Sequence, residues 1–235
     1  MTQMNSLKDK RFLVTGGSAG IGLALAKALV DRHARVALVA RTEGRLRAAA
    51  DHLGGHAILA DVGKEADVVR AVKDAADTLG GLDGLINNAA VYYSKPLEAI
   101  SGESFRRLLD INVIGPALLT REALPHLRTA GGGDIVNISS TSGLMGNAGA
   151  TPYTASKFAL RGMTECWRAE LRKDNIRVIL INPSEVQTGR LQPADNPHKL
   201  FPQDIAHTVV STLEMHPRGF IPEVTVFATN PWKSV

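Results

Sequence analysis

The amino-acid sequence predicts an α/β fold in which a parallel sheet of about seven strands is covered by helices on both faces. Short apolar runs alternate with longer segments of helical periodicity along the whole chain. The apolar runs are nearly continuous, which is typical of strands that are buried on both faces. No change of composition and no internal repeat interrupts the alternation, so we expect a single domain over residues 1–235.

Each element is predicted from a local pattern of this kind. Apolar runs predict strands at residues 11–15, 35–40, 55–60, 84–87, 134–139, 177–182 and 219–226. Periodic segments predict helices at residues 21–33, 45–53, 64–79, 105–127, 153–173 and 202–215. In such sheets ligands bind beyond the carboxyl ends of the strands. We therefore expect the residues that directly follow six strands to share one edge: Gly16, Arg41, Asp61, Asn88, Ser140 and Pro183.

Composition narrows the classes of protein. Hydrophobic residues make up 44% of the chain, and the net charge of +4 is not gathered into a basic run, so nucleic-acid binding is not predicted. Cys166 is the only cysteine, which excludes an internal disulfide, fits a reducing compartment and suggests a core or interface residue. The apolar runs are too short to cross a membrane, and the first residues do not resemble a signal peptide. We expect a cytoplasmic globular protein without a metal site.

A glycine-rich turn, Thr15-Gly-Gly-Ser-Ala-Gly-Ile-Gly22, lies between the first predicted strand and the first predicted helix. Glycines permit a tight turn and let backbone N–H groups at the helix N-terminus approach a pyrophosphate. Glycines also make ordinary turns, but this position favours a doubly wound, Rossmann-type fold that binds a dinucleotide. The expected cofactor contacts in the turn are Gly16, Ser18, Gly20, Ile21 and Gly22.

The end of the second predicted strand indicates which dinucleotide is preferred. A site for NAD normally places Asp or Glu there, to accept a hydrogen bond from the ribose 2′-hydroxyl. Here Ala40 is followed by Arg41, whose guanidinium suits a 2′-phosphate. We therefore expect NADP(H) to be preferred over NAD(H), the alternative being a solvated arginine.

Tyr153 and Lys157 are one helical turn apart, so the ammonium can lie close to the phenol. A free phenol, with a pKa near ~10, exchanges protons poorly at neutral pH. A fixed positive charge lowers that pKa and makes Tyr153 a candidate general acid/base. Ser140 lies shortly upstream; Ser139 is the alternative serine, and alternation along a strand points the two to opposite faces.

Together these residues resemble the short-chain dehydrogenase/reductase family in its compact single-domain form, from about residue 7 to residue 226. The glycine-rich turn matches the family's cofactor motif, and Asp61-Val62 matches its adenine-contacting pair. Asn87-Asn88-Ala89-Ala90 matches its N-N-A-G segment, with Ala in place of the last Gly. The catalytic tetrad is matched by Asn112, Ser140, Tyr153 and Lys157, and the segment that faces the nicotinamide is matched around Pro183, Val186 and Thr188.

The resemblance implies a role for each member of the tetrad. Tyr153 would exchange a proton with the substrate oxygen, and Ser140 would orient that oxygen. Lys157 would hold the nicotinamide ribose and lower the pKa of Tyr153, so that both residues also contact the cofactor. Asn112 would anchor a water that links Lys157 to solvent, and the cofactor would supply the hydride. For Asn112 the alternative is a purely local structural role.

The region after the sixth predicted strand departs from the family pattern. Ser184 stands where Gly is usual, and Glu185 adds a carboxylate that either touches substrate or is solvated. His198 and Lys199 are expected to be solvated, and the short polar segment 189–201 predicts a substrate lid. Substrate contacts are expected from residues 92–96, 142–151 and 185–191, with an apolar wall at Tyr92, Leu144, Met145 and Ala148. For Tyr92 and Tyr93 the alternative is ordinary packing within the loop.

The expected function is NADPH-dependent reduction of a ketone, with 3-oxoacyl thioesters among the candidate substrates. The alternatives are oxidative alcohol dehydrogenation and a non-catalytic, cofactor-sensing binding protein. The resemblance also implies a homo-oligomer, a dimer or tetramer, formed through Ala117, Leu118, Ala159, Met163 and Trp167. An acidic acyl carrier protein would need a basic surface, which arginines 121, 128, 161, 168 and 172 supply unless they simply face solvent.

Overall fold

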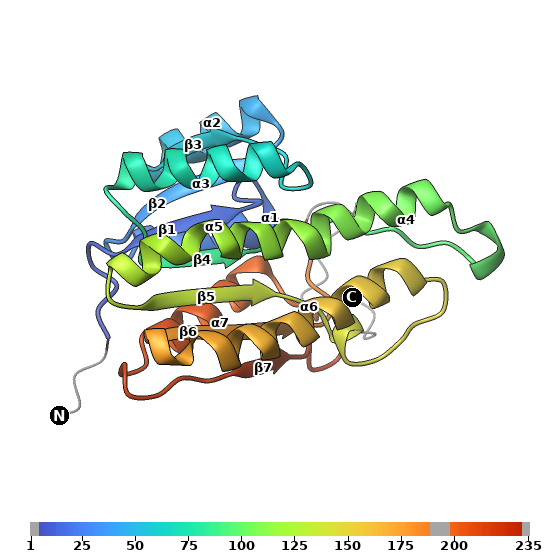
Figure 1. Cartoon of the computed structure of the whole chain (residues 1–235). Helices are drawn as coiled ribbons and strands as arrows, with labels where there is room; N and C mark the ends of the chain where they lie inside the picture. The colour runs from blue at the N-terminus through green and yellow to red at the C-terminus, as the bar shows by residue number, and fades with distance from the viewer. Residues whose placement is uncertain (1–4, 189–197, 232–235) are drawn as a thin grey trace.

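The computed structural model describes residues 5–188 and 198–231, and it contains a seven-stranded sheet in which every strand pairing is parallel (Figure 1). The strands lie in the order β3-β2-β1-β4-β5-β6-β7. Their bounds are β1 (Arg11–Thr15), β2 (Arg35–Ala40), β3 (His56–Leu59), β4 (Gly84–Asn87), β5 (Gly133–Ile138), β6 (Ile176–Pro183) and β7 (Glu223–Val226). The order changes direction between β1 and β4, where ligands bind in sheets of this kind. The predicted Rossmann-type fold is confirmed.

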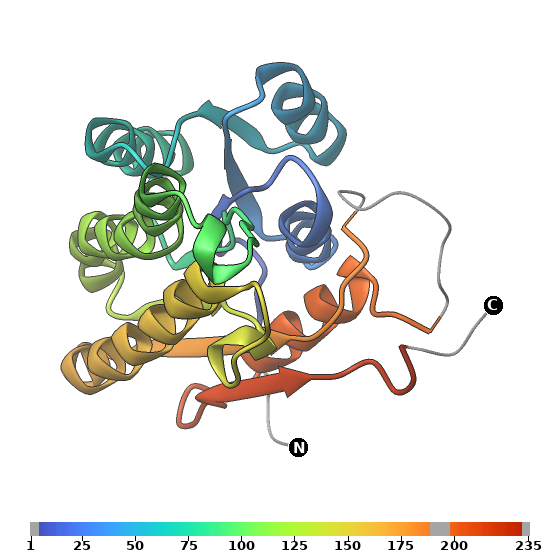
Figure 2. The same cartoon turned by 90° about the vertical axis from the view of Figure 1, so that its right-hand side faces the viewer.

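Helices cover both faces of the sheet, as Figure 2 shows in a view onto the carboxyl ends of the strands. One face carries α1 (Gly20–Val30), α2 (Glu43–Leu53) and α7 (Pro202–Leu213). The other carries α3 (Glu65–Leu79), α5 (Gly115–Thr129) and α6 (Thr151–Leu171). A further helix, α4 (Gly102–Leu109), extends past the carboxyl edge of the sheet (Figure 1).

Two hydrophobic cores explain the continuous apolar strands. Side chains of β1 alternate between them: Phe12 and Val14 pack under α1, α2 and α7, whereas Leu13 packs under α3 and α5. Because both faces of each central strand are buried, neither face tolerates a run of polar residues. The sequence pattern therefore reflects the two-sided packing directly.

Buried amides tie α6 to the centre of the sheet. Asn87 Nδ2 donates to Asn137 Oδ1 at 2.9 Å, and Asn137 Nδ2 donates to Thr164 Oγ1 at 2.8 Å. Buried polar groups are costly unless they are hydrogen-bonded, so this chain favours one position of α6 on β4 and β5. The candidate catalytic residues Tyr153 and Lys157 lie on this helix.

Several element boundaries differ from the predicted ones. The predicted helix 105–127 is three segments: α4, a π-helical turn at Asp110–Ile114, and α5. The helix starts earlier because Ser101 Oγ accepts a hydrogen bond from Ser104 N at 3.3 Å and caps it. The helix α6 begins at Thr151, with Pro152 in its first turn, and β7 is limited to its last four predicted residues. Cys166 is exposed on α6, which excludes a core position, and of the two predicted places the interface stays a prediction.

Arginines close the amino edge of the sheet. Arg35 Nη1 donates to Leu79 O at 2.7 Å, and Arg11 donates to Gly80 O, at the C-terminal end of α3. These side chains satisfy carbonyl groups that a helix end leaves without partners. Arg11 also pairs with Asp83 at 2.6 Å, and Arg177 pairs with Asp134 at 2.6 Å. The amino ends of β1, β5 and β6 are therefore held by ion pairs.

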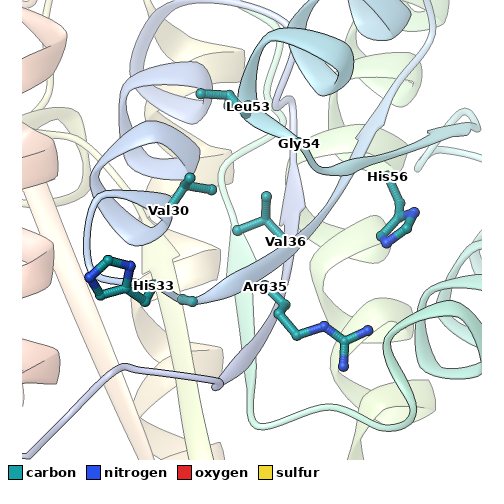
Figure 3. Close-up of a pocket in the computed structure, with 8 residues that line it drawn as sticks. Val30, His33, Arg35, Val36, Leu53, Gly54 and His56 are labelled. Atoms are coloured by element: carbon teal, nitrogen blue, oxygen red, sulfur yellow. The ribbon is translucent and has the colours of Figure 1, made fainter.

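A hollow of about 340 Å³ lies at this amino edge, with an apolar floor of Val30, Val36 and Leu53 and a rim that includes His33, Arg35 and His56 (Figure 3). It is at the opposite end of the strands from the glycine-rich turn and the tetrad. The C-terminal ends of α1 and α2 meet it, and the negative pole of a helix disfavours an anion. We assign the hollow no part in the site.

Candidate active site

The glycine-rich turn adopts a conformation that only glycine accommodates well. Gly16 has φ +67° and Gly20 has φ +54°, both in the left-handed region. Gly22 has no room for a side chain, since a Cβ there would lie 2.3 Å from Gly16 O and 2.5 Å from Asn88 Nδ2. The first turn of α1 carries no acidic residue, so its positive pole is open to an anion. This arrangement fits a pyrophosphate.

Gly22→Ala is expected to disrupt this turn, because the added Cβ cannot avoid the backbone of Gly16. We expect NADPH affinity to fall more than about tenfold, together with a loss of thermal stability. Calorimetric titration and a melting curve would measure both. Gly44→Ala in α2 is the matched control, because a Cβ there meets nothing within 4 Å. Equal NADPH affinity in the two variants would contradict the proposed role of the turn.

Thr15 and Asn88 join the glycine-rich turn to the end of β4. Thr15 Oγ1 accepts hydrogen bonds from Asn88 N at 3.0 Å and Ala89 N at 3.1 Å, and it donates to Ile86 O at 3.1 Å. Asn88 Nδ2 donates to Thr15 O at 2.8 Å. The two predicted cofactor segments are thus one hydrogen-bonded unit at the topological switch point. Ser18 is half-buried, and Ile21 packs against the core under α1.

Asp61, after β3, has a partner that the sequence did not indicate. Its carboxylate pairs with Arg107 of α4 and accepts from Gly63 N at 3.0 Å. Burial acts to raise the pKa of Asp61, but the hydrogen bonds from Gly63 and Arg107 and the charges of Arg107 and Arg41 outweigh it and hold the pKa below its usual range. Arg41 is exposed beside this carboxylate, whereas the Val62 side chain is buried in the core. The adenine contact expected of Val62 would therefore be made by its backbone.

Lys157 is a buried cation. Its side chain is almost wholly enclosed, its Nζ donates to Ile138 O at 2.9 Å, and Nζ lies 5.6 Å from the centroid of the Tyr153 ring. Burial lowers the pKa of Lys157 to about 8, so the ammonium is still charged at neutral pH. None of the ion pairs among the described residues includes Lys157. A buried charge held without a carboxylate is costly to the fold, which is typical of functional positions.

The two serines that directly follow β5 differ as strand alternation predicts. Ser140 is partly exposed, and its Oγ accepts from Ser142 N at 3.1 Å. Ser139 is buried, and a Cβ on Gly143 would lie 2.9 Å from its Oγ. Among the residues that the structure describes, Ser139 Oγ has no hydrogen-bond partner. Ser140 is the serine that can meet a ligand.

Asn112 lies in the π-helical turn between α4 and α5. Its Oδ1 accepts from Val91 N at 2.9 Å, and its Nδ2 donates to Val91 O at 2.9 Å and to Ser156 Oγ at 3.2 Å. Ser156 Oγ in turn donates to Tyr153 O at 2.7 Å. The side chain therefore connects the loop after β4 to the helix of Tyr153, and the water expected at Asn112 stays a prediction. Such π turns occur frequently at functional sites.

The segment after β6 passes close to the glycine-rich turn. A Cβ on Gly20 would lie 3.3 Å from Thr188 Cβ, and Val186 forms a parallel bridge with Leu200. Ser184, in the usual place of Gly, accepts from Ala228 N at 3.0 Å and so holds the chain beyond β7.

Glu185 and Lys199 form an ion pair at 2.8 Å. Their side chains are 47% and 37% exposed, so the pair lies at the surface, which agrees with the prediction that both are solvated. His198 lies in a turn. Most of the predicted lid, residues 189–197, lies outside the described residues, and so does the last part, 189–191, of the predicted substrate-contact range 185–191.

The arginines of α5 and α6 are mostly engaged within the chain. Arg121 pairs with Glu65, Arg128 with Asp174, and Arg161 with Glu223. Arg168 donates to Pro222 O at 2.8 Å. These contacts leave less positive charge for an acidic carrier protein than the sequence alone suggests. No helix among the described residues is both long and apolar enough to cross a membrane, and no three potential metal-ligating side chains are placed together there.

Two residues that contact the candidate site residues had weak sequence signals. Arg107 is distant from Asp61 in the chain, and only the fold brings them together. Ser156 lies between Tyr153 and Lys157, three residues after the tyrosine, so helical spacing alone offered a hint of its place. Its bond to Asn112 depends on the π-helical turn.

Comparison with known proteins gives consistent matches. A family model described as short chain dehydrogenase matches residues 10–199. The chain is 34% identical over 233 residues to Uncharacterized oxidoreductase YxnA of Bacillus subtilis (strain 168), spanning 92% of this chain and 65% of that relative, just under two thirds of its length. It is 38% identical over 182 residues to L-fucose dehydrogenase of Bos taurus, spanning 76% of this chain and 67% of that protein.

A solved structure is also similar along nearly its whole length. The crystal structure of a short chain dehydrogenase from Burkholderia cenocepacia J2315 in complex with NADP matches with a TM-score of 0.88 and 31% identity. The match covers 95% of this chain and 98% of that chain.

Proposed function

The chain belongs to the short-chain dehydrogenase family, and we propose that it is an NADPH-dependent oxidoreductase that reduces a ketone to a secondary alcohol, with Tyr153 as the proton donor. The observation that carries this proposal is the buried ammonium of Lys157 beside the ring of Tyr153. Burying the Lys157 ammonium destabilises the fold. We therefore attribute its position at the carboxyl edge of the sheet to its electrostatic effect on Tyr153 or on a ligand.

The residues of the carboxyl edge fit a nicotinamide dinucleotide. The turn at Gly16, Gly20 and Gly22 leaves space where side chains would otherwise stand, and it lies at the open N-terminus of α1. Asp61 and Val62 would hold the adenine end, and Pro183, Val186 and Thr188 would border the nicotinamide end. Asn88 and Ala89 lie between these ends. When bound, the cofactor supplies the hydride.

The protein residues then supply position and a proton. Ser140 Oγ orients the substrate oxygen, and Tyr153 donates its phenolic proton to that oxygen as the carbonyl becomes an alkoxide. The ammonium of Lys157 favours the phenolate that is left, and its N–H groups beyond the one used by Ile138 O are available to a ribose hydroxyl. Asn112 holds the helix of Tyr153 in place through Ser156.

The test of this function is a screen of ketones, ketoesters and 3-oxoacyl thioesters for loss of NADPH absorbance. The reverse reaction, oxidation of an alcohol, is the second candidate, because the chemistry is reversible and a relative is named L-fucose dehydrogenase. Turnover of alcohols with NADP⁺ but of no carbonyl compound with NADPH would favour it. Binding of NADPH without turnover of any substrate would favour a cofactor-sensing protein.

Arg41→Glu tests the preference for NADP(H). Arg41 is exposed at the end of β2, and the added carboxylate would repel a 2′-phosphate and accept a hydrogen bond from a 2′-hydroxyl. We expect NADPH affinity to fall at least about tenfold while NADH affinity changes little or improves. Titration of both reduced cofactors by fluorescence would measure this. Arg45→Glu, an exposed change on α2, is the control; equal losses for both cofactors in Arg41→Glu would refute the phosphate contact.

We also propose a homo-oligomer through the outer faces of α5 and α6. Ile114, next to α5, and Phe158, on α6, expose 48% and 45% of their surface, which is unusual for large apolar side chains on regular elements. Cys166 is exposed on the same helix as Phe158, so an interface position remains its proposed place.

A further inference from the structure

Tyr92 lies against the proposed proton donor although most of its surface is open. The centroids of the Tyr92 and Tyr153 rings are 4.9 Å apart, with 70° between the ring planes, which is an edge-to-face contact. Tyr92 nevertheless has 65% of its surface exposed. Much of the surface of Tyr92 is therefore available beside the ring of Tyr153.

The backbone on either side of Tyr92 is pinned. On one side, the Asn112 amide holds both the N–H and the C=O of Val91, each at 2.9 Å. On the other side, Ser94 Oγ and Lys95 N donate to Gly149 O at 2.9 and 2.8 Å. An exposed loop tyrosine usually has a mobile backbone, whereas this one is braced from two elements. Pre-ordering of this kind lowers the entropic cost of binding a ligand.

The same amide also holds the backbone of the helix that carries Tyr153. Asn112 Nδ2 donates to Ser156 Oγ at 3.2 Å, and Ser156 Oγ donates to Tyr153 O at 2.7 Å. One buried side chain thus sets the distance between the loop of Tyr92 and the helix of Tyr153. This chain of contacts gives Asn112 a positioning role that does not depend on a bound water.

The position of Tyr92 determines which part of a substrate it can touch. The hydroxyl of Tyr153 must reach the carbonyl oxygen, so a ring that contacts Tyr153 faces the substituent on the carbonyl carbon. A flat group there can stack on the open face of Tyr92, which gives more than the burial of apolar area alone. Gly149 O accepts the hydrogen bond that links the loop of Tyr92 to the loop that contains Met145. Met145 exposes half of its surface, and its sulfur suits contacts with an aromatic ring.

We propose that Tyr92 is a specificity-determining residue that binds an aromatic ring attached to the substrate carbonyl, so that the enzyme prefers aryl ketones to open-chain ketones of equal size. This inference rests on the proposed reductase function, and it names the substrate class of that same site. Asn112 acts on this preference only through the positions of Tyr92 and Tyr153.

The experiment compares acetophenone with 2-octanone, which has the same number of heavy atoms, in the wild type, Tyr92→Phe and Tyr92→Ala with NADPH. We expect Tyr92→Ala to lower kcat/KM for acetophenone about tenfold, mainly through a higher KM, and to change 2-octanone less than about threefold. Tyr92→Phe keeps the ring and should retain the wild-type ratio of the two substrates. Leu97→Ala, which removes a 75% exposed side chain farther along the same loop, is the control and should also retain it.

A second readout does not depend on turnover. Saturation-transfer NMR should detect 1-phenylethanol on the NADP⁺-bound wild type and on Tyr92→Phe, with a signal at least about threefold weaker on Tyr92→Ala. If Tyr92→Ala lowers kcat/KM equally for both ketones, or if the wild type favours 2-octanone, the aryl specificity is wrong while the reductase function stands. If the wild type reduces neither these nor any other carbonyl compound, the proposed function itself fails.

Discussion

Tyr153→Phe is expected to lower kcat for ketone reduction about 10³-fold while NADPH affinity changes little. The substitution removes only the phenolic oxygen, so the ring beside Tyr92 and the backbone bond from Ser156 to Tyr153 O are kept. The remaining turnover would come from the bound geometry and from Ser140. Steady-state kinetics and fluorescence titration of NADPH would separate the two effects.

Tyr93→Phe makes the same chemical change in a loop tyrosine and serves as the matched control. Tyr93 lies in the range 92–96 that is expected to contact substrate, but its hydroxyl accepts a hydrogen bond from Ser101 N at 3.0 Å and so is engaged with the loop backbone. We expect a small loss of stability and near-normal kcat. Near-normal kcat in Tyr153→Phe as well would remove the acid/base assignment.

Lys157→Met is expected to abolish turnover and yet to make the cofactor-free protein more stable at pH 7. Burial depresses the pKa of Lys157 from 10.5 to about 8, which corresponds to a cost of about 3 kcal/mol for holding the charged form. Methionine keeps an unbranched apolar chain but leaves Ile138 O without its donor, which costs about 1 kcal/mol. The expected net gain in the free energy of unfolding is about 2 kcal/mol.

The pH dependence of this gain has a definite sign. Below pH 8 both the folded and the unfolded chain carry a protonated Lys157, so the full burial cost is present. Between pH 8 and 10.5 the folded protein binds fewer protons than the unfolded one, and wild-type stability rises relative to the variant. Denaturant unfolding at pH 7 and near pH 10 would therefore show the advantage of Lys157→Met shrinking.

Lys173→Met, at an exposed position after α6, is the control for loss of a positive charge alone. Its stability difference from the wild type should stay near zero at both pH values. A Lys157→Met protein that is less stable than the wild type at pH 7 would show that the ammonium contributes to the fold, and the functional argument from its burial would fall.

The sequence predicted the sheet well because two-sided burial leaves a strong local signal. The runs around Leu13, Leu38 and Ile86 are apolar since helices pack on both of their faces, so their identity as strands did not depend on distant contacts. The edge strand β7 is only half-buried, so its local apolar signal is weaker. Its predicted start is therefore four residues too early.

The interruption of the helix at Asn112 could not be predicted from the pattern of apolar residues. A π-helical turn keeps apolar residues at roughly helical spacing, so periodicity reads it as one continuous helix. The contacts that matter most at the site, from Arg107 to Asp61 and from Asn112 to Val91 and Ser156, join residues that are far apart in the chain. Motif spacing pointed to Asn112, Ser140, Tyr153 and Lys157 as candidates, but it gave no sign of the hydrogen bonds that hold the backbone around Tyr92.

The arginines at the amino edge have a consequence for how such a chain can change over time. Arg11, Arg35 and Arg177 fasten helix ends and strand starts at the end of the sheet that faces away from the ligand. The loops at the other end can then lengthen, shorten or exchange residues without releasing the strands that carry them. New substrate preferences can evolve in those loops on a scaffold whose integrity is secured elsewhere.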